Sequence, residues 1–369
     1  MTYIRRAVWP PAVLTVLLHV AFLVPVLQRV GYDLSSMGFV ADKHRGETEF
    51  AAITHFHRGD GYDGQFYFLV SHNPFQSWEG HIDHPVRHLR VGYPLVCFAL
   101  SAGGQPQALP VVMPLVNLLC IGGLTWLGAY WAKKHEQSPW WGVWLPLVTI
   151  ALSPMLRNLT DPLGLTAALG LLIAWDERRL GWVIVCAAAT LFTREQNIIV
   201  PAFIGIAALA SREWKIAGGL LAVAAVWLGW VALLQHVYGM WPLLPTTGNL
   251  AAPFAGLEVW WDTQNSHNLM RFLRGSYAVF MLGQVVLLLI HVGRKRGRFG
   301  CIEAVGLTVL ATALVAGPSI WEDWWSYTRN LMLLPMAVWM LNVQAGLRWA
   351  LAFGMTSAVL VHGSMKVMQ

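Results

Sequence analysis

Two aspartates, Asp60 and Asp63, stand between glycines in the segment GDGYDGQFYF, which covers residues 59–68. Glycine next to aspartate is typical of a turn that presents carboxylates. A carboxylate presented in this way can accept a proton from a hydroxyl group, so both aspartates are candidate catalytic residues, with Asp63 as the general base. The aromatic residues that follow suggest a platform for a sugar ring or a lipid. The alternative is structural: Asp63 would cap a helix that begins near Gln65.

A basic stretch follows in the same part of the chain. Arg87, His88 and Arg90 could hold a phosphate group through charge-assisted hydrogen bonds. The alternative is a basic belt that faces lipid headgroups. The spacing of His55 and His57, and of His81 and His84 with Asp83, could also suit zinc. No supporting pattern accompanies these histidines, so no metal site is expected.

Further charged residues lie close to apolar segments: Arg157, Asp161, Arg194, Glu195 and Arg329. Charged side chains inside a membrane are functional candidates by default. Arg329 follows the aromatic segment 321–327 and is a second candidate phosphate ligand. For the other four the alternative is a structural ion pair, for instance Arg157 with Glu195 or Arg194 with Asp161.

The composition shows what kind of protein must position these residues. Of the 369 residues 56% are hydrophobic and 12% are charged, against about 45–50% and roughly 25% in soluble domains. This balance excludes a disordered chain and a soluble nucleic-acid-binding protein, despite the net charge of +6. All four cysteines fall in apolar runs without metal-ligand spacing, and no disulfide scaffold is expected. The chain is predicted to be an all-α polytopic membrane protein.

About 11 transmembrane helices, with a range of 9–13, are expected from the apolar runs. The first run covers residues 7–30, and Arg5 and Arg6 place its N-terminus in the cytoplasm. Run 91–104 is short and is expected to be re-entrant or interfacial. The remaining runs are 109–132, 139–154, 162–175, 180–193, 196–210, 214–236, 276–292, 300–318, 330–345 and 349–363.

Basic clusters between the runs fix the orientation of two hairpins. By the positive-inside rule the tips of hairpins 139–175 and 180–210 face outward. Their four runs have only 14–16 residues, which at about 1.5 Å per residue is short of a hydrocarbon core of about 30 Å. Polar backbone at that depth must line a wet cavity or be buried in protein. We therefore expect Arg157, Asp161, Arg194 and Glu195 to line one recessed, outward-facing cavity.

The whole chain, 1–369, is predicted to form a single membrane domain with two outer loops. The first periplasmic loop, 31–90, contains the candidate catalytic acids, eight of the 19 acidic residues and seven of the 13 histidines. The second periplasmic loop covers 237–275. Such a one-sided distribution of polar residues suits an enzyme that works at the outer face.

The segment from Gly61 to Tyr67, Asn73-Pro74, and the spacing of Arg87, Arg90 and Tyr93-Pro94 resemble the first outer loop of integral-membrane clan C glycosyltransferases. Within that clan the chain looks most like bacterial relatives of GPI-type mannosyltransferases. The tips at Asp161 and Arg194 and the segment before Arg329 are similar to that group as well. The loop departs from the pattern in lacking an Asp-x-Asp metal motif, so a divalent metal is not expected.

The resemblance implies a multi-span membrane enzyme whose first outer loop folds into interfacial helices. It further implies a polyprenyl-phosphate sugar donor, with mannose or another hexose as the sugar, and an acceptor that can be a lipid, a glycan or a protein. Asp63 matches the catalytic acid position. From this we infer direct, inverting displacement, with phosphate held by Arg87, His88, Arg90, Arg194 and Arg329, and the cavity supported by Tyr62, Gln65, Tyr93, Arg157, Asp161 and Glu195.

The expected location is a bacterial inner membrane, with the site facing the periplasm and lipids around the spans. No nucleic-acid partner is expected, and the sequence is compatible with a partner subunit. Two other classes fit the composition. A transporter or flippase of an anionic lipid or lipid-linked sugar would also use intramembrane charges and broken helices. A non-catalytic assembly partner of an envelope machine would tolerate loss of Asp63.

Overall fold

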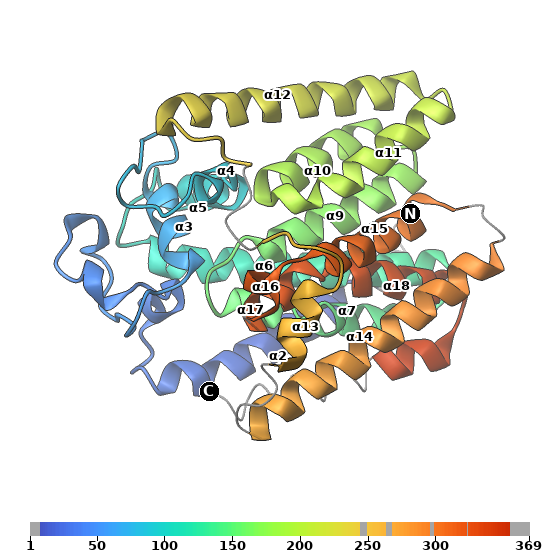
Figure 1. Cartoon of the computed structure of the whole chain (residues 1–369), viewed down its shortest axis with the longest axis horizontal. Helices are drawn as coiled ribbons and strands as arrows, with labels where there is room; N and C mark the ends of the chain where they lie inside the picture. The colour runs from blue at the N-terminus through green and yellow to red at the C-terminus, as the bar shows by residue number, and fades with distance from the viewer. Residues whose placement is uncertain (1–7, 244–248, 263–267, 296–298, 323, 355–369) are drawn as a thin grey trace. The chain divides into compact units, whose positions relative to one another are not determined.

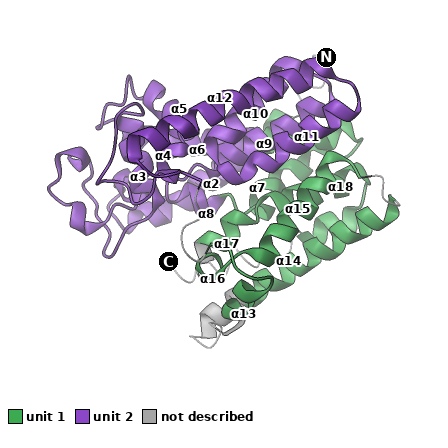
Figure 2. Ribbon diagram, turned by 45° about the horizontal axis from the view of Figure 1, so that its top comes forward, with its two compact units in different colours: residues 1–12, 124–151, 245–369 green, residues 13–123, 152–244 purple. Residues whose placement is uncertain are grey.

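The structure is a computed structural model that describes residues 8–243, 249–262, 268–295, 299–322 and 324–354 (Figure 1). Within these ranges the chain forms helices, turns and isolated bridges but no β-strand, which confirms the all-α fold class. Contacts divide the chain into two compact units (Figure 2). Unit 1 comprises residues 1–12, 124–151 and 245–369, and unit 2 comprises 13–123 and 152–244. The sequence had predicted one membrane domain over residues 1–369, whereas the contacts divide the chain into these two units.

Among the residues that the structure describes, four helical segments are long and apolar enough to cross a membrane: α2 (Trp9–Gln28), α6 (Leu109–Lys134), α12 (Trp214–Tyr238) and the Gly275–Arg294 part of α14 (Asn268–Arg294). Large apolar side chains such as Leu17 on α2 and Leu221 on α12 are exposed, as expected of surfaces that face lipid rather than water. The chain is therefore a membrane protein. Arg5, Arg6 and residues 355–363 of the last predicted span lie outside the described residues.

Four helices of unit 2 form a bundle: α9 (Asp161–Asp176), α10 (Leu180–Thr193), α11 (Ile199–Ala210) and α12. α9 packs along α10, and both α10 and α11 pack on α12. Arg178 and Arg212 adopt the left-handed conformation just after α9 and α11. Such a residue ends a helix, and a short connection makes consecutive helices antiparallel neighbours. The short helix η5 (Glu195–Ile198) joins α10 to α11, so Arg194 and Glu195 lie at the turn of the predicted hairpin 180–210.

The predicted first outer loop is a layer of short helices in the same unit: η1 (Leu34–Gly38), η2 (Asp42–His44), η3 (Thr48–Phe50), α3 (Asp63–His72) and α4 (Val86–Leu89), followed by α5 (Gly92–Leu100). Its own apolar core includes the buried rings of Phe50, Tyr67, Trp78 and Tyr93. A parallel β-bridge between Ala41 and His57 holds together the two ends of segment 42–56. The loop is therefore a packed layer and not an extended connection.

Unit 1 contains the remaining short helices around α14. α18 (Leu333–Gln344) packs against α15 (Cys301–Val315), α14 and α7 (Leu145–Val148), and α7 also contacts η4 (Pro139–Trp144). α13 (Ala255–Asp262) packs on α16 (Pro318–Trp321), which is followed by α17 (Trp324–Asn330). Gly142 lies so close to α6 that an added Cβ would meet the Ala129 nitrogen at 2.5 Å.

Two apolar runs differ from continuous spans. Run 139–154 consists of η4, α7 and α8 (Leu152–Met155). Prolines at 139, 146 and 154 remove backbone donors, and Ile150 has a positive φ of 55°, so the run is broken and is not one span. Run 91–104 contains only the nine residues of α5, about 13 Å of helix at 1.5 Å per residue, too short to cross.

Candidate functional site

Asp63 lies in the first turn of α3, where the positive end of the helix dipole favours a carboxylate. The cap position belongs to Tyr62, whose extended backbone donates its N–H to the Phe39 carbonyl at 3.0 Å. Asp63 is 8% exposed. The carboxylate is therefore not the helix cap that the alternative interpretation expected, and it points into a group of charged residues.

Glycine is required on either side of this aspartate. Gly61 has a positive φ of 73°. At Gly64 an added Cβ would meet the Arg157 carbonyl oxygen at 2.2 Å and the Gly38 carbonyl oxygen at 2.7 Å. α3 thus begins in backbone contact with the tip that precedes α9, and this contact brings Asp63 next to residues almost a hundred positions later in the chain.

Arg87 is the partly accessible cation of the group. Its Nη1 lies 3.0 Å from Asp63 Oδ2, and its Nε and Nη2 donate to the two oxygens of Asp83 at 3.1 and 3.2 Å. The Arg87 side chain is 21% exposed and that of Asp83 is 52% exposed. Arg87 therefore reaches both the buried carboxylate and the surface.

Arg90 is the buried cation. It donates from Nε and Nη2 to both oxygens of Glu195, at 2.8 and 2.7 Å, and from Nη1 to the Tyr67 hydroxyl at 3.0 Å. Asp63 Oδ2 is 3.6 Å from the same Nη1. A bidentate ion pair of this kind fixes the guanidinium in one orientation. Glu195 thus ties the tip between α10 and α11 to the loop layer.

Both guanidinium groups stay charged. Burial by itself lowers the pKa of Arg87, and the Asp63 carboxylate raises it, with a net pKa above the ordinary value. For Arg90 burial again lowers the pKa, but Glu195 raises it well above the ordinary value. Asp63 therefore lies between two permanent positive charges, an arrangement that can hold an anion.

The remaining charges of the two tips also meet in unit 2. Arg194 forms an ion pair with Asp161, with side chains 6% and 2% exposed. This is one of the two structural pairs that the sequence suggested, whereas Glu195 pairs with Arg90 and not with Arg157. The Arg157 guanidinium lies over two rings, 4.4 Å from the centre of Phe39 and 4.3 Å from that of Tyr62.

Several predicted site residues have other positions. The Asp60 side chain is fully exposed and lies 3.8 Å from Lys43. Gln65 binds backbone, accepting from Ala41 N–H and donating to the Asp60 carbonyl. The Tyr93 hydroxyl donates to the Met113 carbonyl at 2.8 Å. Gln65 and Tyr93 thus hold the backbone of the layer, whereas Asp60 lies at its surface.

His88 is buried and both ring nitrogens have protein partners. Nε2 is 2.9 Å from the Pro74 carbonyl, which can only accept, so Nε2 donates and Nδ1 accepts from the Tyr238 hydroxyl at 2.8 Å. The same hydroxyl accepts from the Trp78 N–H at 3.0 Å. Burial lowers the pKa of His88, which favours the neutral ring. In this state His88 joins the end of α12 to the loop layer and does not offer a proton to phosphate.

Arg329 belongs to unit 1, in α17, and is 6% exposed. Its predicted role as a phosphate ligand stays a prediction. Three residues of the cluster in unit 2 were not assigned to the site from sequence: Tyr67, Asp83 and Phe39. Asp83 lies before the start of α4 (Val86–Leu89), so the helical spacing rule does not account for its contact with Arg87. The partners of Tyr67 and Phe39 had no sequence signal.

The arrangement combines a carboxylate acceptor of protons with two guanidinium groups, a set suited to chemistry on a phosphate-linked substrate. Comparison with known proteins adds no assignment: no family model, no curated protein and no solved structure matches the chain. The functional argument therefore depends on the residues themselves.

Proposed function

We propose that this chain is a membrane glycosyltransferase that transfers a hexose from a polyprenyl-phosphate donor to a hydroxyl of an acceptor. The observation that supports it is the position of Asp63, 3.0 Å from Arg87 and 3.6 Å from Arg90. A nucleophilic hydroxyl needs a base, and a leaving phosphate needs positive charge close by. Residues from one short stretch of loop supply both.

In the proposed reaction Asp63 accepts the proton of the acceptor hydroxyl as its oxygen attacks the anomeric carbon. The bond between that carbon and the phosphate oxygen breaks, and the lipid phosphate leaves with the electron pair. The charge on this phosphate grows during the step and is offset by arginine. Direct displacement from the opposite face inverts the configuration at the anomeric carbon. Asp63 then releases its proton to solvent.

The two arginines divide the work. Arg90 is held by Glu195 and Tyr67 and has little exposure, so it positions Asp63 and provides a fixed positive field. Arg87 is more exposed and shares its donors between Asp63 and Asp83. Donor phosphate would take over Arg87 donors from Asp63, which leaves the carboxylate available as a base once the donor is bound.

The proposal includes a topology of about 11 spans in a bacterial inner membrane, with the Asp63 cluster facing the periplasm. The one-sided placement of loop 31–90 and the tips at Asp161 and Glu195 supports it. The acceptor is a lipid, glycan or protein hydroxyl. The phosphate contacts expected of Arg194 and Arg329 stay predictions, and in unit 2 Arg194 is already paired with Asp161.

The test is turnover of a panel of polyprenyl-phosphate hexoses by the purified chain in nanodiscs, with released polyprenyl phosphate as the readout. Asp63→Asn should lower the rate about 10²–10⁴-fold while donor binding persists. Asp60→Asn is the matched control, because it makes the same change on an exposed aspartate three residues away and should keep the rate.

Equal loss in both variants, or full activity of Asp63→Asn, would refute the assignment of the base. A chain that releases no phosphate from any donor but moves a labelled lipid between leaflets would instead be a transporter. Lipid vesicles that contain the purified chain, in place of nanodiscs, allow both activities to be measured on one sample.

A further inference from the structure

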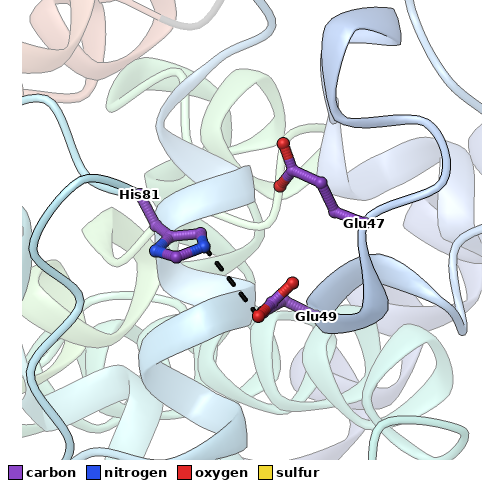
Figure 3. A group of neighbouring side chains, drawn as sticks. All are labelled: Glu47, Glu49 and His81. Carbon is purple, nitrogen blue, oxygen red and sulfur yellow. Dashed lines mark ion pairs between the residues drawn. The ribbon is translucent and has the colours of Figure 1, made fainter.

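A second group of charged side chains lies in the loop layer, apart from the Asp63 cluster. Glu47, Glu49 and His81 are each half-buried, and one ligand atom from each residue lies within 4.8 Å of the others (Figure 3). Figure 3 shows the two carboxylates and the imidazole converging from two segments of chain. His81 Nε2 is 3.9 Å from Glu49 Oε1.

Buried residues of the apolar core anchor both segments that carry these side chains. Glu47 and Glu49 flank the start of η3, whose Phe50 is buried in the core of the layer. His81 follows Trp78, which is 2% exposed and belongs to the same core. The His81 N–H donates to the Trp78 carbonyl at 3.0 Å. The three side chains are therefore held close together by anchors that do not depend on their own attraction.

The negative charges of Glu47 and Glu49 favour a bound cation. Among the residues that the structure describes, neither Glu47 nor Glu49 forms an ion pair with a lysine or arginine. Glu47 accepts from His44 Nδ1 at 3.0 Å, and Glu49 accepts from the Thr48 hydroxyl at 3.1 Å. Hydrogen bonds of this kind orient ligand carboxylates around metal ions. Two neighbouring carboxylates without a fixed positive charge repel each other.

We propose that Glu47, Glu49 and His81 bind a divalent transition-metal ion of the zinc class. Zinc accepts imidazole nitrogen and carboxylate oxygen at about 2.0–2.2 Å. Tetrahedral ligands at that distance are roughly 3.4 Å apart, so small rotations of the glutamate side chains close the present spacing. The nitrogen ligand favours this class over Ca²⁺ and Mg²⁺, which prefer oxygen alone.

The ion would join two segments that are more than 30 residues apart in a layer made largely of short helices and turns. Asp83, two residues beyond His81, holds Arg87. The proposed role of the metal ion is thus to stabilise the loop layer and not to take part in sugar transfer. The zinc alternative weighed from the sequence used His55, His57, His81 and His84 with Asp83. Of these, His81 belongs to the present group, whereas His84 Nδ1 accepts from the Val86 N–H and Asp83 binds Arg87.

The test uses the full chain in detergent, stripped of metal and freed of any histidine tag. Zn²⁺ titration by calorimetry should show saturable one-to-one binding with a raised melting temperature, and a large excess of Ca²⁺ or Mg²⁺ should not compete. Glu49→Gln and His81→Gln should each weaken binding at least tenfold. Glu79→Gln and His55→Gln change the same residue types in the same loop and should bind as the parent does.

Absence of saturable binding, or unchanged affinity in His81→Gln, would overturn the proposal. Co²⁺ provides an independent measurement, because its visible absorption reports the ligand set and should change in Glu49→Gln even where that variant keeps its stability. The proposal stands apart from the proposed activity, since Asp63→Asn should bind Zn²⁺ normally.

Discussion

Replacement of Asp161 by asparagine tests whether the tips of the two hairpins are buried in protein. Asp161 begins α9 and pairs with Arg194 at the end of α10, and both side chains are almost completely hidden. The substitution keeps the shape of the side chain and removes its charge. Arg194 is then a buried cation without its ion-pair partner.

The expected cost follows from burial. Removing one partner of a buried ion pair costs about 3–5 kcal/mol, because the other charge stays out of water. That is a loss of roughly two to three and a half orders of magnitude in the folding equilibrium. The pair of Asp42 and Arg45 is held by hydrogen bonds of 2.9 and 2.7 Å, but its side chains are 54% and 62% exposed. Asp42→Asn should therefore cost only about 0–1 kcal/mol.

The assay is the free energy of unfolding in mixed detergent micelles for Asp161→Asn, Arg194→Gln, the double variant and Asp42→Asn. The double variant should lose less than the sum of the single variants, because it leaves no buried charge alone. If Asp161→Asn cost no more than Asp42→Asn, the tips would be open to water and the argument for a buried tip would fail.

Three other substitutions test separate contacts. Gly64→Ala should destabilise the chain by about 1–3 kcal/mol, because its Cβ would collide with the Arg157 carbonyl. A Cβ added at Gly181 would meet no atom within 4 Å, so Gly181→Ala should be neutral in the same melting assay. Burial holds the pKa of His88 below its usual value. The unfolded chain therefore takes up the proton first, and the free energy of unfolding should fall as pH drops below about 6.5. His88→Gln should flatten this dependence on pH, and an unchanged dependence would contradict the prediction. Arg87→Gln should raise the donor dissociation constant by roughly tenfold or more with the fold intact, measured by calorimetry, and equal donor affinity would remove Arg87 from the phosphate site.

The sequence predicted the all-α membrane class and the short distance between Asp63, Arg87 and Arg90. Composition is sufficient for the first. For the second, the three residues lie within one loop, and their types and spacing were informative. The sequence grouped Glu195 with Arg157, Asp161 and Arg194 at the two hairpin tips, and its contact with Arg90 is seen only in the structure.

The partners within the group could not be predicted. Whether Glu195 meets Arg90 or Arg157 depends on how the tip turns, and that turn is set by contacts such as Gly64 against the Arg157 carbonyl. Asp60 and Asp63 look alike in the sequence, yet Asp60 is fully exposed. The group of Glu47, Glu49 and His81 has no regular spacing, because buried Phe50 and Trp78 bring its two segments together.

The contacts of Arg157 with the rings of Phe39 and Tyr62 bear on which cation suits this position. Its guanidinium carbon lies close to both ring centres, and a guanidinium donates its N–H groups in its own plane. An ammonium group has no such plane, and lysine at this position would donate in any direction. Two ring contacts together with in-plane donors thus favour arginine over lysine here.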